Sequence, residues 1–82
     1  MRKAPTKAQR DWRKQVAGRI RTAMDAAGYR TAYSLSKVEG MPNNPSVIQL
    51  WLDGATAPDA ENTAKLALVL GCSTDYLLLG ER

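Results

Sequence analysis

Apolar residues recur every four positions in the first third of the chain, at Trp12, Val16, Ile20 and Met24. This spacing places them along one stripe of an α-helix. Gly28 is typical of the position just after a helix end. The pattern therefore predicts a helix over about 9–27 whose apolar stripe faces a core.

Capping residues predict two shorter helices in the middle of the chain. Thr31 is a favoured N-cap, and it predicts a helix over about 32–39. Asn44 followed by Pro45 combines a favoured N-cap with a favoured first residue, and predicts a helix over about 45–53.

Two more helices are predicted near the end of the chain. Asp59 can cap a helix over about 59–70, and Ser73 or Thr74 can cap a last one over about 74–79. Apolar and polar residues nowhere alternate with a period of two over a useful length, so no strand is predicted. The expected fold is all-α with five helices. Trp12, Met24, Trp51, Tyr76 and Cys72 are expected in its core.

The charge is concentrated at the beginning of the chain. Residues 1–30 hold nine Lys or Arg and two Asp, a net charge of +7, whereas residues 31–82 carry a net charge of −3. Residues 1–8 are predicted to be a mobile basic arm ahead of a single domain over 9–80. Such arms can wrap DNA or enter its minor groove, and a solubilising tail is the equal alternative. The basic residues of this arm region are Arg2, Lys3, Lys7 and Arg10.

The residue inventory excludes several kinds of site. The 82 residues contain no His and a single Cys, Cys72. They therefore offer no structural zinc site, no disulfide framework and no Ser-His or Cys-His nucleophile. The acidic residues form no paired arrangement, and no phosphate-binding glycine loop is present. We expect a protein that is not an enzyme, with no cofactor and no small-molecule substrate.

Cellular location is inferred from the same inventory. The longest apolar run, Leu66 to Leu70, is too short to cross a membrane, so no membrane partner is expected. No apolar stretch follows the basic start, as it would in a signal peptide. A single thiol fits a reducing compartment. The expected location is cytoplasmic.

From the second predicted helix onward, capping, core and turn residues follow one another in a recognisable order and spacing. They are Thr31, Leu35, Ser36, Gly40, Ile48, Trp51, Gly54 and Pro58. Leu70-Gly71-Cys72-Ser73 and Asp75-Tyr76-Leu77-Leu78 follow in register. In this pattern the chain, over about residues 12–80, resembles the Cro/C1-type (XRE-like) helix-turn-helix family of phage repressors. The resemblance implies a five-helix, repressor-like helix-turn-helix bundle.

The chain departs from the family pattern at the turn and in its charges. Between Gly40 and Trp51 it is about two residues longer than usual, which implies an elongated turn at 41–44. Glu39 stands where a Leu is common, and Ala32 where a Gln is usual. No Lys or Arg lies between Lys37 and Lys65, so the predicted recognition helix has no positive charge.

The resemblance implies a sequence-specific regulator of transcription that binds double-stranded DNA, with the helix over 45–53 in the major groove. The implied base contacts are Asn43, Asn44, Ser46 and Gln49, with Asn44 favoured as a helix cap. The implied contacts to the DNA backbone are Arg30, Tyr33, Ser34, Lys37 and Thr56. For Arg30 and Lys37, a merely solvated charge is an equal alternative.

Repressors of this kind usually bind their operator as homodimers. Leu77, Leu78 and Leu79 are a candidate dimer surface, or else close the core. The chain is also compatible with being the DNA-binding part of a longer repressor. The alternative function is a protein–protein interaction module on the same fold, since fold does not determine function. In that case the uncharged helix over 45–53 is a docking surface for a partner protein.

Overall fold

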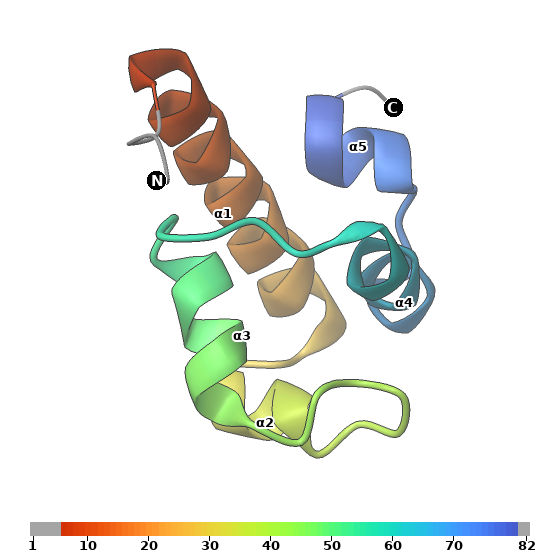
Figure 1. The fold of residues 1–82 in the computed structure, drawn as a ribbon. Coiled ribbons are helices and arrows are strands. Elements are labelled where there is room, and N and C mark those ends of the chain that lie inside the picture. Colours follow the sequence, from red (N-terminus) through yellow and green to blue (C-terminus); the bar gives the residue numbers. More distant parts are fainter. Residues whose placement is uncertain (1–5, 81–82) are drawn as a thin grey trace.

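The computed structural model describes residues 6–80, which form five α-helices joined by short connections (Figure 1). The helices are α1 (Lys7–Ala27), α2 (Ala32–Ser36), α3 (Pro45–Leu52), α4 (Ala60–Leu70) and α5 (Thr74–Leu79). Residues 6–80 contain no β-strand. The prediction of an all-α fold with five helices is therefore confirmed.

Helix starts follow the capping residues closely. The side chains of Thr31, Asn44, Asp59 and Ser73 each accept a hydrogen bond from a backbone N–H in the first turn of their helices, as predicted. The first helix begins earlier than predicted, at Lys7.

The early start of α1 has a local cause. Thr6 Oγ1 accepts the N–H of Gln9 at 3.1 Å, while Gln9 Oε1 accepts the N–H of Thr6 at 2.9 Å. This capping box satisfies two backbone donors that a helix end otherwise leaves open. Residues 7 and 8 therefore belong to α1 and not to an arm. Arg2 and Lys3 lie outside the described residues.

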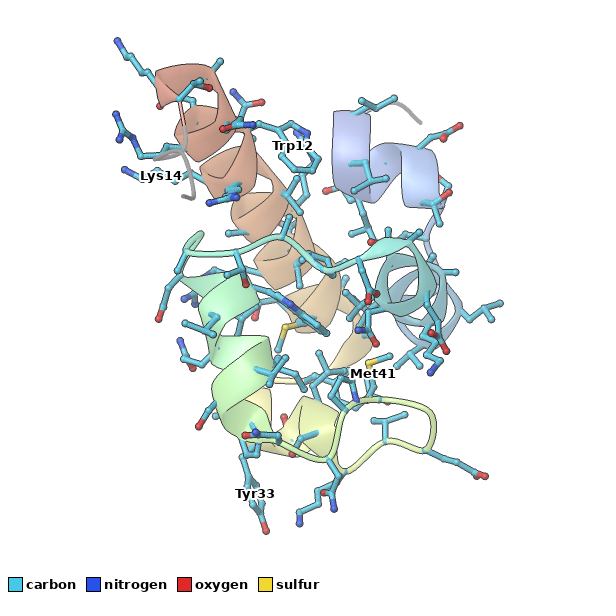
Figure 2. The ribbon with its side chains drawn as sticks, viewed as in Figure 1. Trp12, Lys14, Tyr33 and Met41 are labelled. Carbon is cyan, nitrogen blue, oxygen red and sulfur yellow. The ribbon has the colours of Figure 1, made fainter. Side chains whose placement is uncertain are left out.

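The second helix is shorter than predicted and ends at Ser36 instead of residue 39. The chain tightens there, because the N–H groups of Lys37 and Val38 each bond to a carbonyl three residues earlier. Gly40 then adopts a φ of 94°, which lies in the left-handed region and redirects the chain. Met41 returns to the core, where it is 7% exposed (Figure 2).

The core lies where α1 meets the other helices. This helix packs against α3, α4 and α5, while α2 packs against α3 and α4 against α5. Met24 and Trp51 are buried, as predicted, and Tyr76 and Cys72 are partly buried against the core. The side chains with almost no exposed surface are Val16, Ile20, Leu35, Ile48, Thr63, Leu66 and Leu77.

The prediction that Trp12 lies in the core is wrong. Its side chain is 37% exposed and lies on the side of α1 that faces α5 (Figure 2). Its indole N–H donates to the carbonyl of Leu78 at 2.8 Å. An indole can donate its N–H to a hydrogen-bond partner while its ring packs on apolar surface. Trp12 therefore links α1 to α5 at the surface of the molecule.

Arginines of α1 are hydrogen-bonded to carbonyls at the ends of other helices. Arg19 donates to the carbonyls of Leu77 and Leu78 at 3.0 and 2.9 Å. Arg21 donates to the carbonyl of Leu52 at 2.9 Å. The last carbonyls of a helix lack partners within it and carry partial negative charge, so cations stabilise them. Part of the positive charge of α1 therefore holds α3 and α5 in place.

Replacing Arg19 with Met is expected to lower the free energy of unfolding by about 1–2 kcal/mol, because two hydrogen bonds from a charged group are lost while most of the aliphatic stem is kept. Urea unfolding followed by far-UV circular dichroism measures this. Arg10→Met is the matched control, since Arg10 is exposed on the same helix. Equal stabilities of the two variants would contradict a stabilising role for the hydrogen bonds from Arg19 to α5.

Candidate nucleic-acid interface

Helices α2 and α3 lie together at the end of the molecule away from α5 (Figure 1). The inner side of α3 is anchored by Ile48, Trp51 and Leu52, which are 0%, 4% and 6% exposed. Its outer side presents Ser46 and Gln49 to solvent. The burial of one side fixes which polar side chains the other side displays.

The four predicted base contacts are all exposed. They differ in whether their side chains already form a hydrogen bond within the protein. Asn44 Oδ1 caps α3 by accepting the N–H of Ser46 at 3.0 Å, which confirms the preference for a capping role. Gln49 Nε2 donates to Asp53 Oδ1 at 2.9 Å, one helical turn further on. Within residues 6–80, the side chains of Asn43 and Ser46 have no such hydrogen bond.

The predicted backbone contacts on α2 divide in a similar way. Tyr33 is 60% exposed and points away from the helices (Figure 2). Lys37 Nζ lies 4.7 Å from the centre of the Tyr33 ring, a cation–π arrangement. Ser34 is tied to Thr31, because its hydroxyl donates to the Thr31 carbonyl at 2.7 Å and accepts the Thr31 N–H at 3.2 Å. Tyr33 and Lys37 are thus the more available pair.

The other two predicted backbone contacts, Arg30 and Thr56, are both exposed. Arg30 lines a shallow pocket together with Arg21 and Leu52, so it lies beside the meeting point of α1 and α3. Thr56 lies in the segment that follows α3, two residues after Gly54. The two residues therefore both lie near the C-terminal half of α3.

Gly54 brings this segment close to α1. A Cβ atom built on Gly54 would lie 3.1 Å from Cγ and 3.2 Å from Cα of Lys14, and the φ of Gly54 is 74°. Only glycine combines this backbone conformation with so close an approach. Arg13 Nη1 also donates to the carbonyl of Ala55 at 3.3 Å. Arg13 therefore places positive charge beside the segment that follows α3, and the backbone of Lys14 lies next to it.

Sequence reasoning missed this pair of cations. Lys14 is exposed on α1, forty residues before Gly54, and no local pattern links the two (Figure 2). The absence of Lys and Arg between positions 37 and 65 describes α3 correctly. It did not reveal that α1 places cations next to α3 through tertiary packing.

The described residues of the predicted arm lie elsewhere. Lys7 and Arg10 occupy the first turn of α1. At a rise of 1.5 Å per residue, a helix of this length extends over about 30 Å. Lys7 therefore lies at the opposite end of α1 from Arg30.

The three leucines of α5 have different surroundings. Leu77 is fully buried and Leu78 is partly buried, while Leu79 is 63% exposed. Of the two alternatives for these residues, closing the core describes Leu77. Leu77 is not part of an exposed dimer surface, because α5 packs it against α1 and α4.

Cys72 is partly buried, and this burial raises the pKa of its thiol. A raised pKa leaves less of the reactive thiolate at neutral pH. We expect alkylation of Cys72 by iodoacetamide to be slower in the folded protein than in urea, with its half-maximal rate at a higher pH. Mass spectrometry of time points measures both rates. Equal pH profiles in the two states would contradict this expectation.

Within residues 6–80, no cluster of potential ligands fits a metal ion, and no helix is long and apolar enough to cross a membrane. No protein-family model matches the chain. Neither a curated protein sequence nor a solved structure is significantly similar to it.

Proposed function

We propose that this protein is a sequence-specific regulator of transcription that binds double-stranded DNA with α3 in the major groove, in the manner of helix-turn-helix repressors. The observation that carries the proposal is the two-sided character of α3. One side is locked into the core by Ile48 and Trp51, while the other displays Ser46 and Gln49. Hydroxyl and amide side chains on a rigid helix are suited to reading base edges.

The dimensions of α3 suit this role. With its side chains an α-helix is about 10–12 Å across, and the major groove, about 12 Å wide, admits a helix of that width. In helix-turn-helix docking, the N-terminal part of the second helix contacts the bases. Ser46 lies in the first turn of α3 and Gln49 in the second, while Asn43 directly precedes the N-cap Asn44.

Positive charge for phosphate contacts comes from the helices around α3. Lys37, with Tyr33, projects from α2, while Arg30 and Lys14 lie near the C-terminal half of α3. Phosphate contacts fix orientation on the duplex, whereas base contacts supply specificity. An uncharged α3 flanked by cations is compatible with this division of roles.

A dimer that binds two half-sites is the corresponding proposal for assembly. Half-sites one helical turn apart place two recognition helices about 34–36 Å from each other. In such a dimer, an operator with inverted symmetry mirrors the symmetry of the protein. Repression of transcription by occupying such an operator completes the proposed role.

A protein–protein interaction module is the second candidate. The observation in its favour is that Leu50 on α3 and Tyr33 on α2 are 45% and 60% exposed. Exposed aromatic and aliphatic side chains on and beside an uncharged helix resemble a docking surface. Such a module lacks the strong salt dependence that DNA binding has.

Selection of bound sequences from a random duplex library, carried out at two salt concentrations, tests the proposal. We expect an inverted repeat to be recovered, with binding that weakens as salt rises. A parallel selection with Gln49→Ala is expected to lose the preference at one position in each half-site. No binding at low salt would contradict DNA recognition and favour the interaction module.

A further inference from the structure

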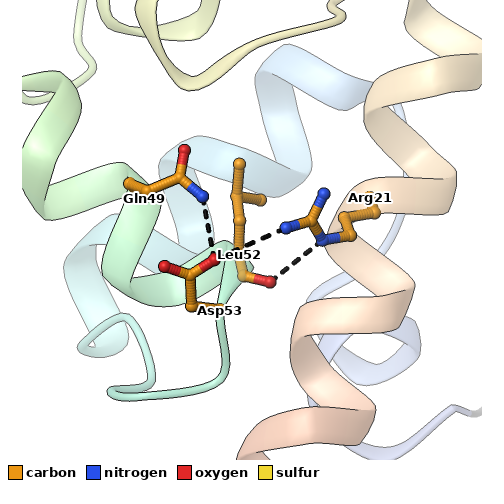
Figure 3. A network of polar contacts seen from close by, with 4 residues as sticks. All are labelled: Arg21, Gln49, Leu52 and Asp53. Atoms are coloured by element: carbon orange, nitrogen blue, oxygen red, sulfur yellow. Dashed lines mark hydrogen bonds and ion pairs between the residues drawn. The ribbon is translucent and has the colours of Figure 1, made fainter.

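A chain of polar contacts runs from α1 to the outer side of α3 (Figure 3). Arg21 Nε donates to the carbonyl of Leu52 at 2.9 Å, which fixes the guanidinium at the end of α3. Arg21 Nη2 lies 3.6 Å from Asp53 Oδ1. The same carboxylate oxygen accepts a hydrogen bond from Gln49 Nε2 at 2.9 Å. The exposed amide of Gln49 is thus bound to the carboxylate of Asp53, which in turn pairs with the guanidinium of Arg21.

Asp53 adds little to the stability of α3, since a hydrogen bond between residues four apart on a helix contributes only about 0.2–0.5 kcal/mol. An acidic side chain at the C-terminal end of a helix interacts unfavourably with the helix dipole. The side chains of Arg21 and Asp53 are 54% and 53% exposed, and ion pairs this exposed contribute little to stability. A role in orienting Gln49 accounts for the arrangement better.

The contact with Asp53 has a consequence for hydrogen bonding by Gln49. A carboxylate accepts only, so the amide must turn its NH₂ group toward Asp53. The carbonyl oxygen of Gln49 then points away from Asp53 (Figure 3). The amide retains that acceptor and a second N–H donor. An acceptor beside a donor matches the N6 amino group and the N7 atom of adenine in the major groove.

We propose that Asp53, held by Arg21, is a positioning residue that fixes the Gln49 amide in the orientation that reads adenine. This inference rests on the proposed function, because it presupposes that α3 lies in the major groove. It predicts which base Gln49 selects. It also names two residues, Arg21 on α1 and Asp53 at the C-cap of α3, that set the selectivity without touching a base.

The test uses duplexes that carry each of the four base pairs at the position whose preference Gln49→Ala abolishes. Dissociation constants are measured for the wild-type protein and for Asp53→Ala and Asp53→Asn. An Asn side chain can donate as well as accept, so Asp53→Asn keeps the size of the side chain but removes the acceptor-only group that orients the amide. Asp53 is exposed, and circular dichroism verifies that each variant is folded.

We expect the wild-type protein to prefer adenine at this position by about tenfold, the effect of one good bidentate contact. Asp53→Ala and Asp53→Asn are both expected to reduce the preference to about threefold or less, because neither offers an acceptor-only group to Gln49. A general loss of affinity, equal for all four base pairs, would indicate a merely structural role and overturn the inference.

Failure of the inference and failure of the proposed function are distinguishable. If the wild-type protein selects a site and Gln49→Ala relaxes it, but Asp53→Ala leaves the preference unchanged, only the inference is overturned. Preference for a base other than adenine at that position overturns it as well. If the wild-type protein binds no duplex, the proposed function fails and the inference fails with it.

Discussion

Replacing Ile48 with Ala is expected to lower the free energy of unfolding by about 3 kcal/mol, within the range typical of large-to-small substitutions in a core. Ile48 has no exposed surface, and it lies in the same cluster as Leu35, Trp51 and Leu66. Its removal leaves a cavity in this cluster, to which α1, α2 and α3 all contribute side chains. A domain of this size has a total stability of roughly 4–12 kcal/mol, so the loss is a large fraction of the whole.

Urea unfolding followed by far-UV circular dichroism measures the loss. Leu50→Ala is the matched control, because Leu50 belongs to the same helix and is 45% exposed. We expect it to cost about 1 kcal/mol or less, since little buried surface is removed. If both variants lose the same stability, the assignment of the inner and outer sides of α3 is incorrect.

Replacing both Arg30 and Lys37 with Gln is expected to weaken binding to duplex DNA by about tenfold or more. The slope of log affinity against log salt should fall by about 2 units, because two phosphate contacts and their released counterions are lost. Both residues are exposed, Arg30 in the connection before α2 and Lys37 at the C-cap of α2. Fluorescence anisotropy of a labelled duplex over a salt series measures both quantities.

The control for this double variant is Lys65→Gln. Lys65 lies on α4, where its Nζ atom is 3.2 Å from Glu61 Oε1. We expect this substitution to leave the salt slope unchanged, apart from the small effect of net charge. An unchanged slope in the double variant would contradict the placement of phosphates next to α2 and α3.

Local signals predicted most of the helix boundaries because the causes are local. Asn44 with Pro45, and Asp59, act through backbone groups within three residues of themselves. The end of α2 was predicted three residues too late, because its last turn tightens and Met41 must reach the core. Trp12 shares the four-residue spacing of the α1 stripe. It lies near the N-terminal end of that stripe, where its indole N–H reaches a carbonyl of α5.

The candidate site was predicted only in part. Exposure of Ser46 and Gln49 follows from the apolar spacing of α3. The contact between Gln49 and Asp53 joins residues four apart, a spacing at which side chains on a helix meet, so it was accessible to sequence reasoning. The contributions of Lys14 and Arg21 were not, because they depend on how α1 crosses α3.

Recognition of DNA through α3 is tested most directly by titrating isotope-labelled protein with duplex DNA and following the amide NMR chemical shifts. We expect the shifts to change most at Ser46 and Gln49 on α3 and at Tyr33 and Lys37 on and just after α2, with α4 unaffected. Changes confined to α4 or to the first turn of α1 would contradict recognition through α3, and so would no change at low salt.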